Sequence, residues 1–73
     1  MNRYELICKL DKDFLILIKN GLIPVHLLGW KTIYELYLKE IKFNNKSTTC
    51  FLVADEFNLS EKHIRSIVKF MSD

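Results

Sequence analysis

The chain lacks most of the sequence features that indicate an enzyme or a metalloprotein. Its 73 residues contain only two glycines, Gly21 and Gly29, so no glycine-rich loop is available to hold a phosphate. The two histidines, His26 and His63, are far in sequence from each other and from the cysteines, without metal-ligand spacing. No local Ser–His–Asp or Cys–His set occurs. We therefore expect no catalytic residues, no metal and no cofactor.

Disulfide frameworks, membrane-length apolar runs and leader sequences are missing as well. Cys8 and Cys50 lie in apolar patterns without CxxC spacing, which is typical of reduced core residues. No apolar run approaches the roughly 20 residues of a membrane-spanning helix. The first residues do not have the layout of a signal peptide. The expectation is a cytoplasmic protein with no membrane partner.

Neither basic nor acidic residues are in large excess. Eleven basic and nine acidic residues leave a net charge of +2 with the histidines neutral. A strongly basic domain would indicate nucleic acid, so any DNA-binding surface here must come from local placement of charge. Apolar residues make up 49% of a chain that is too short to bury a large core. This surplus predicts that some apolar surface is buried between chains.

The N-terminal segment, residues 1–30, is apolar and predicted to be helical. The apolar side chains of residues 4–10 suit one helical face, namely Tyr4, Ile7, Cys8 and Leu10. A second helix is expected to start near Asp11 or Asp13 and to stop at Gly21. Its run of apolar residues at 14–18 is too wide for one buried stripe. We therefore expect the segment to pair two chains, with Phe14, Ile16 and Leu17 at the contact.

The remaining residues, 31–73, predict three further helices, at about 32–43, 48–57 and 60–71. Before them, Pro24 is expected to open a short helix that ends at Gly29. Thr32 with Glu35 has the spacing of a capping box, Ser47 or Thr48 is expected to cap the second helix, and Ser60 the third. The sequence thus predicts an all-α fold in one domain, 1–73: a small helical bundle with a C-terminal tri-helical core and no sheet.

Residues 50–69 have the pattern of a helix-turn-helix. Ala54 is small enough for two helices to approach closely, Asn58 tolerates a left-handed backbone, and Leu59 would plug the turn from below. The second helix is amphipathic. Its inner stripe is aliphatic and consists of Ile64, Ile67, Val68 and Met71. Its outer face is basic and polar and consists of Lys62, Arg65, Ser66 and Lys69. An ordinary surface helix has the same pattern, but the turn and Ala54 favour DNA binding.

This stretch resembles helix-turn-helix regulators of bacteria and their phages, loosely the phage middle-operon regulator type. Those proteins carry a run Ala…Phe/Tyr-x-Leu-Ser-x-x-x-Ile-x-x-Ile, and the match covers about a third of this chain, at Ala54, Phe57, Leu59, Ser60, Ile64 and Ile67. One departure is Asn58, where such turns often have Gly. The resemblance implies contacts with double-stranded DNA from Ser60, Glu61, Lys62, Arg65, Ser66 and Lys69. Thr48 and Thr49, near the start of the preceding helix, are expected to donate to phosphates as well.

Two functions from different classes follow. The first is a small sequence-specific transcriptional regulator that binds DNA as a homodimer, with recognition helices in major grooves about 34 Å apart. The alternative is a helix-turn-helix fold used for protein binding, as in a phage or mobile-element protein that docks on a host complex. The weak net charge and the apolar surplus favour the alternative. Phe51 and Leu52, which fall off the inner face of their helix, would mark such a surface if exposed. Trp30, Tyr34 and Tyr37 are expected to pack in the core rather than to stack on bases.

Overall fold

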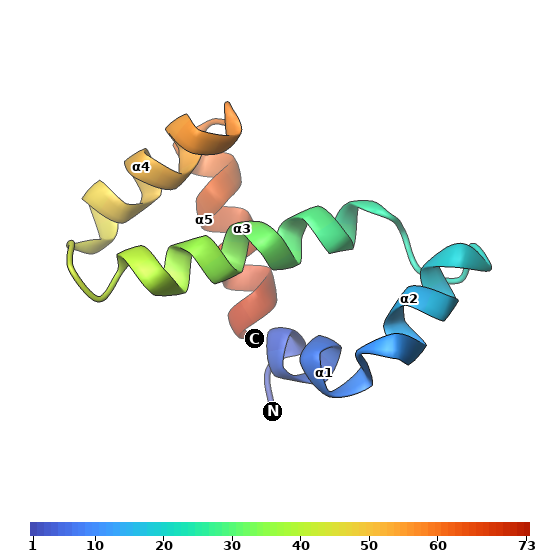
Figure 1. The fold of residues 1–73 in the computed structure, drawn as a ribbon. Coiled ribbons are helices and arrows are strands. Elements are labelled where there is room, and N and C mark those ends of the chain that lie inside the picture. Colours follow the sequence, from blue (N-terminus) through green and yellow to red (C-terminus); the bar gives the residue numbers. More distant parts are fainter.

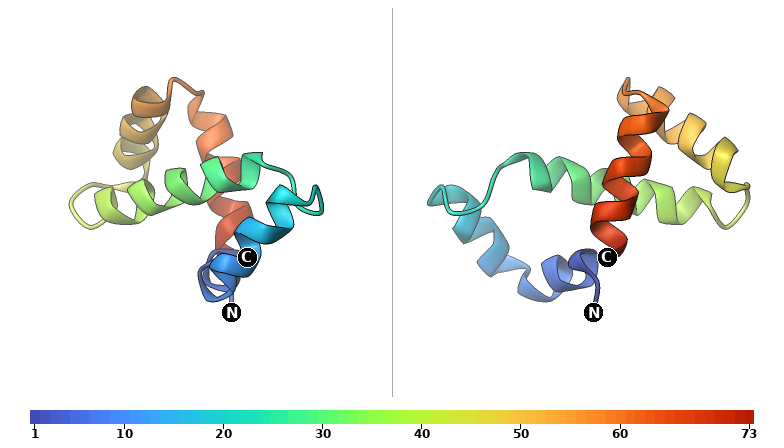
Figure 2. Two further views of the ribbon diagram at one scale, coloured as in Figure 1. Left: turned by 45° about the vertical axis from the view of Figure 1, so that its right-hand side comes forward. Right: turned by 180° about the vertical axis from the view of Figure 1, so that it is seen from behind.

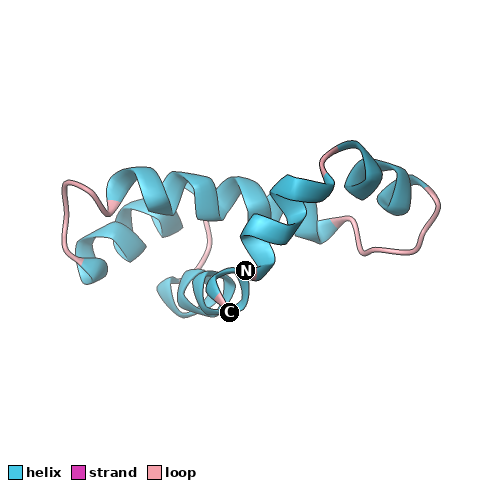
Figure 3. Cartoon of the chain, turned by 90° about the horizontal axis from the view of Figure 1, so that it is seen from below, coloured by secondary structure: helices cyan, strands magenta, loops and turns pink.

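The computed structural model describes residues 1–73 and contains helices only. They are α1 (Arg3–Leu10), α2 (Lys12–Lys19), α3 (His26–Glu40), α4 (Lys46–Phe57) and α5 (Glu61–Ser72). Figure 1 shows α3 across the middle of the molecule, with α4 beside its C-terminal half and α5 crossing behind it. The connections are short loops (Figure 3). The expected all-α class is therefore confirmed, and no helix has both the length and the apolar character that crossing a bilayer requires.

The core lies where α3, α4 and α5 contact one another. Cys50, Val53 and Ala54 of α4 are buried against Ile64 and Ile67 of α5, and the same cluster includes Ile33, Tyr34 and Tyr37 of α3 and Met71 of α5. The inner stripe predicted for α5 is thus confirmed, with Val68 half-buried at its edge. Tyr34 and Tyr37 are core residues, as expected, and burial raises the pKa of the Tyr37 phenol.

The predicted break between two helices at Gly29 is wrong. α3 runs without interruption from His26 to Glu40, and the Thr32 hydroxyl donates to the Leu28 carbonyl at 3.3 Å instead of capping a helix. Glycine inside a helix costs roughly 1 kcal/mol relative to alanine. The neighbouring side chains of Leu27 and Trp30 pack against the core, which offsets this cost and keeps the helix continuous. Glu35, expected to complete the capping box, is also free for other contacts.

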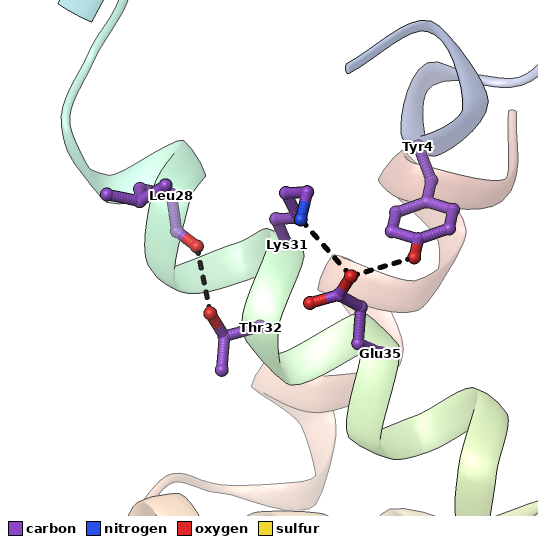
Figure 4. Close-up of polar contacts among 5 residues, drawn as sticks. All are labelled: Tyr4, Leu28, Lys31, Thr32 and Glu35. Atoms are coloured by element: carbon purple, nitrogen blue, oxygen red, sulfur yellow. Dashed lines mark hydrogen bonds and ion pairs between the residues drawn. The ribbon is translucent and has the colours of Figure 1, made fainter. Parts of the chain in front are cut away.

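Glu35 instead joins α3 to α1. Its Oε2 accepts hydrogen bonds from the Tyr4 hydroxyl at 2.9 Å and from Lys31 Nζ at 3.1 Å (Figure 4). The ring of Tyr4 meets that of Tyr34 edge-on, with centroids 5.0 Å apart. Burial raises the pKa of the Tyr4 phenol, and its interactions with Cys8 and Glu35 raise it further. A tyrosine hydroxyl is already protonated at neutral pH, so the raised pKa extends its hydrogen bond to Glu35 to more alkaline conditions.

The N-terminal arm consists of α1 and α2, which meet at Asp11, a residue with a positive φ of 40°. α1 packs on α5 and α2, and α2 contributes one buried side chain, Phe14, to the core. α2 ends as predicted, since Gly21 follows it with a φ of 73°. Figure 2 shows the arm returning from the C-terminal end of α5 to the start of α3.

Three expectations for single side chains are corrected. Cys8 is exposed rather than buried, because the face of α1 that contains Ile7 meets the other helices and Cys8 lies outside that face. Both cysteines are free. Phe14 is buried within its own chain, so it is not available for a contact between chains. Leu59 is 38% exposed and does not plug the turn.

Candidate nucleic-acid interface

α5 forms because its sequence supplies a cap, an apolar stripe and no helix breaker. The Ser60 hydroxyl oxygen accepts from the His63 backbone N–H at 3.1 Å, as predicted for the N-cap. Glu61 lies in the first turn and Lys69 in the last, where their charges suit the helix dipole. Ile64, Ile67 and Met71 are completely buried. The inner face is therefore fixed, and the orientation of the outer face follows from it.

The outer face of α5 carries Lys62, Arg65 and Lys69, all exposed. The ion pairs of the protein are Arg3–Asp73 and Lys31–Glu35, so none of these three cations is neutralised within the chain. A helix rises about 1.5 Å per residue, so Lys62 and Lys69 are roughly 10 Å apart along the axis. This unpaired basic surface is of a size to meet successive groups along one nucleic-acid groove.

The turn before α5 holds it close to α4. Asn58 adopts the left-handed conformation, with φ 56° and ψ 44°, as its tolerance for positive φ predicted. The Asn58 N–H donates to the Asp55 carbonyl, and the Leu59 N–H donates to the Ala54 carbonyl at 2.9 Å. These bonds satisfy carbonyls that a helix end leaves unpaired. Ala54 itself is buried at the contact between α4 and α5, as expected.

The hydroxyl candidates differ in availability. Ser60 and Ser66 are exposed, although the Ser66 hydroxyl already donates to the Lys62 carbonyl at 3.1 Å. Thr48 is exposed near the start of α4. Thr49 is completely buried and its hydroxyl donates to the Asn45 carbonyl at 2.8 Å, so it does not reach a phosphate. The reason is that Thr49 lies four residues before the buried Val53 and so shares the inner face of α4, which starts at Lys46 after the Asn45 cap and not after Ser47 or Thr48.

The flank of α5 holds an aromatic group that the sequence did not predict. The Trp30 ring of α3 lies with its centroid 6.3 Å from that of His63 and 5.2 Å from that of Phe70, both on α5. The ring centroid of His26, one turn before Trp30, lies 4.9 Å from the centroid of the Trp30 ring. Two histidines that are remote in sequence therefore approach the same indole. Only the spacing of His26 and Trp30 on one helix was visible in the sequence.

The side chains of the protein include no arrangement of His, Cys, Asp and Glu that could hold a metal ion. Comparisons with protein-family models, curated proteins and solved structures give no match. The surface of α5 and its surroundings are therefore the features from which a function can be inferred.

Proposed function

We propose that α4 and α5 act as a DNA-binding helix-turn-helix and that the protein is a small sequence-specific transcriptional regulator. The observation that carries the proposal is the outer face of α5, where Lys62, Arg65 and Lys69 are exposed and unpaired. A recognition helix needs such a face, together with an opposite face that holds it rigidly. The turn at Asn58 and the buried Ala54 support the same interpretation.

Each exposed candidate has a role that suits its chemistry. Arg65, in the middle of the basic face, can contact guanine through two hydrogen bonds. Lys69, one turn further along, is assigned to a phosphate. Ser60, Lys62 and Thr48 lie near helix N-termini, where hydroxyl and ammonium groups fix a helix against the phosphate backbone. We assign the remaining two candidates, Glu61 and Ser66, to base edges, where a carboxylate can accept from cytosine.

Arg65→Ala and Lys69→Ala are each expected to weaken DNA binding and to leave stability unchanged. Arg65→Ala should cost about 1–3 kcal/mol of binding free energy and relax specificity at one base position, whereas Lys69→Ala should weaken all sequences alike and reduce the salt slope by about one unit. Titration of duplexes selected from a random pool, at two salt concentrations, separates these effects.

Lys9→Ala is the matched control, because Lys9 is an exposed lysine in the last turn of α1. It removes the same charge far along the chain from α5 and should leave the affinity close to that of the wild type. The DNA-binding proposal would be contradicted if the wild-type protein bound no duplex at low salt. It would also be contradicted if neither Arg65→Ala nor Lys69→Ala altered the affinity for DNA.

Protein binding is the second candidate function. Phe51 is 59% exposed and Leu52 is 39% exposed on the outside of α4. Large apolar side chains exposed together indicate a contact surface for a protein. In this case the partner would be a host protein complex, and the chain would be a phage or mobile-element product. Loss of duplex binding in the experiment above would leave this candidate as the better one.

A homodimer through residues 1–30 belongs to the proposal as well. The exposed apolar residues of α2 support it, since Leu15 is 48% and Ile16 55% exposed. Leu17 is half-buried and Phe14 is buried, so the contact would be made by a narrower surface than the sequence predicted.

A further inference from the structure

An exposed strip on α2 combines an apolar centre with basic ends. Lys12, Leu15, Ile16 and Lys19 recur at the spacing of one helical face and, with Ile18 and Leu28, border a shallow hollow of about 520 Å³. We call the four α2 residues the α2 strip. Neither lysine forms an ion pair within the chain. A partner for this strip must therefore be apolar in the middle and acidic around it.

A surface with that character lies between α3 and α4. It is a hollow of about 320 Å³, which we call the acidic hollow, lined by Leu36, Glu40, Leu52, Asp55 and Glu56. None of its three carboxylates is in an ion pair. They are not arranged to hold a metal ion. An apolar centre within unpaired carboxylates suits a partner that brings apolar side chains flanked by lysines.

The two surfaces are connected along α3. Figure 1 shows α2 near one end of α3 and α4 beside the other end. Leu28 borders the α2 strip and Leu36 lines the acidic hollow. With the exposed Thr32 between them, they follow one row at four-residue spacing, about 12 Å long. Two chains placed antiparallel along this row would bring each α2 strip to the acidic hollow of the other chain.

We propose that a second copy of this chain occupies the acidic hollow through its α2 strip. The two contacts are related by a two-fold axis, so they close a homodimer instead of a filament. Lys12 and Lys19 neutralise the carboxylates of the hollow, and Leu15 and Ile16 cover Leu36 and Leu52. No α5 residue lines either surface, so the basic face stays free. This pairing rests on the dimer part of the proposed function and does not involve DNA.

Charge reversal tests the pairing on both sides. One variant carries Lys12→Glu and Lys19→Glu, and a second carries Asp55→Lys and Glu56→Lys, which are in the last turn of α4, where cations suit the helix dipole. Each variant alone should raise the dissociation constant of the dimer at least about tenfold, because like charges then face each other. An equimolar mixture should dimerise again, since every contact in the mixed dimer joins opposite charges. Sedimentation velocity over a concentration series at low salt measures all three samples, with circular dichroism to verify folding.

A matched control separates this proposal from DNA binding. Lys62→Glu with Lys69→Glu changes the net charge by the same amount as the α2-strip variant, but on α5. It should keep the wild-type dimer while it loses affinity for duplex DNA. Leu52→Ala changes no charge and should weaken the dimer about fivefold by removing apolar contact, which provides a test even if a reversal variant does not fold.

Three results would overturn the pairing. Wild-type protein that stays monomeric up to hundreds of micromolar would leave no dimer to explain. A reversal variant that dimerises like the wild type would show that the contact lies elsewhere. The acidic-hollow variant would give this result if residues 1–30 of the two chains paired with each other. A mixture of the two folded variants that stays monomeric would show that their surfaces do not meet.

Discussion

Ile64→Ala is expected to lower the free energy of unfolding by about 2–5 kcal/mol. Ile64 is completely buried between α5 and its neighbours, so the substitution removes apolar contact and leaves a cavity. Small domains are marginally stable, and a loss of this size would leave much of the protein unfolded. Ile64→Val removes a single methylene group and should cost about 0.5–1.5 kcal/mol, which chemical denaturation can measure.

The neighbouring exposed position provides the control for Ile64. Arg65→Ala alters the outer face of the same helix and should change stability by no more than about 0.5 kcal/mol. Equal effects of Ile64→Ala and Arg65→Ala on the free energy of unfolding would show that the inner stripe of α5 does not stabilise the core.

Ala54→Leu is expected to cost about 1–3 kcal/mol, by overpacking instead of by a cavity. Ala54 is buried where α4 meets α5, and its carbonyl accepts from the Leu59 N–H in the turn. A larger side chain would push the helices apart and disturb that turn. The midpoint of thermal unfolding measures the effect, with Ser47→Leu as the control because it adds bulk at an exposed position of α4. An unchanged midpoint for Ala54→Leu would contradict the close approach of the two helices.

The C-terminal half of the fold was predictable because local and tertiary signals agree there. Ser60 caps α5, Asn58 accepts a left-handed conformation, and Ile64 and Ile67 recur at helical spacing, so each signal indicates the same elements. In α3 the signals disagree. Gly29 and the Thr32–Glu35 pair indicate a helix boundary, but packing of Leu27 and Trp30 against the core keeps the helix continuous. Local sequence does not reveal which of these effects is larger.

The candidate interface was predictable to the extent that it lies on one helix. Helical spacing alone places Lys62, Arg65 and Lys69 opposite the buried stripe. The prediction for Thr49 was wrong because Thr49 lies four residues before Val53, on the buried face of α4, and the cap at Asn45 extends the helix to include it. The approach of His26 and His63 to Trp30 depends on how α3 crosses α5, which only the tertiary structure gives.

Contacts between Arg3 and Phe70 join the two ends of the chain and affect how the protein opens. Arg3 Nη1 donates to the Phe70 carbonyl at 3.1 Å, and the Arg3 guanidinium lies 4.5 Å from the centre of the Phe70 ring. Because α1 is fastened to α5 in this way, its amide protons should exchange with solvent as part of the same cooperative unit as the core. α2, the next helix in sequence, contributes a single buried residue, Phe14, to the core, and its other side chains are half-buried or exposed. We therefore expect local opening of the native state to start at α2 and not at the first residues of the chain.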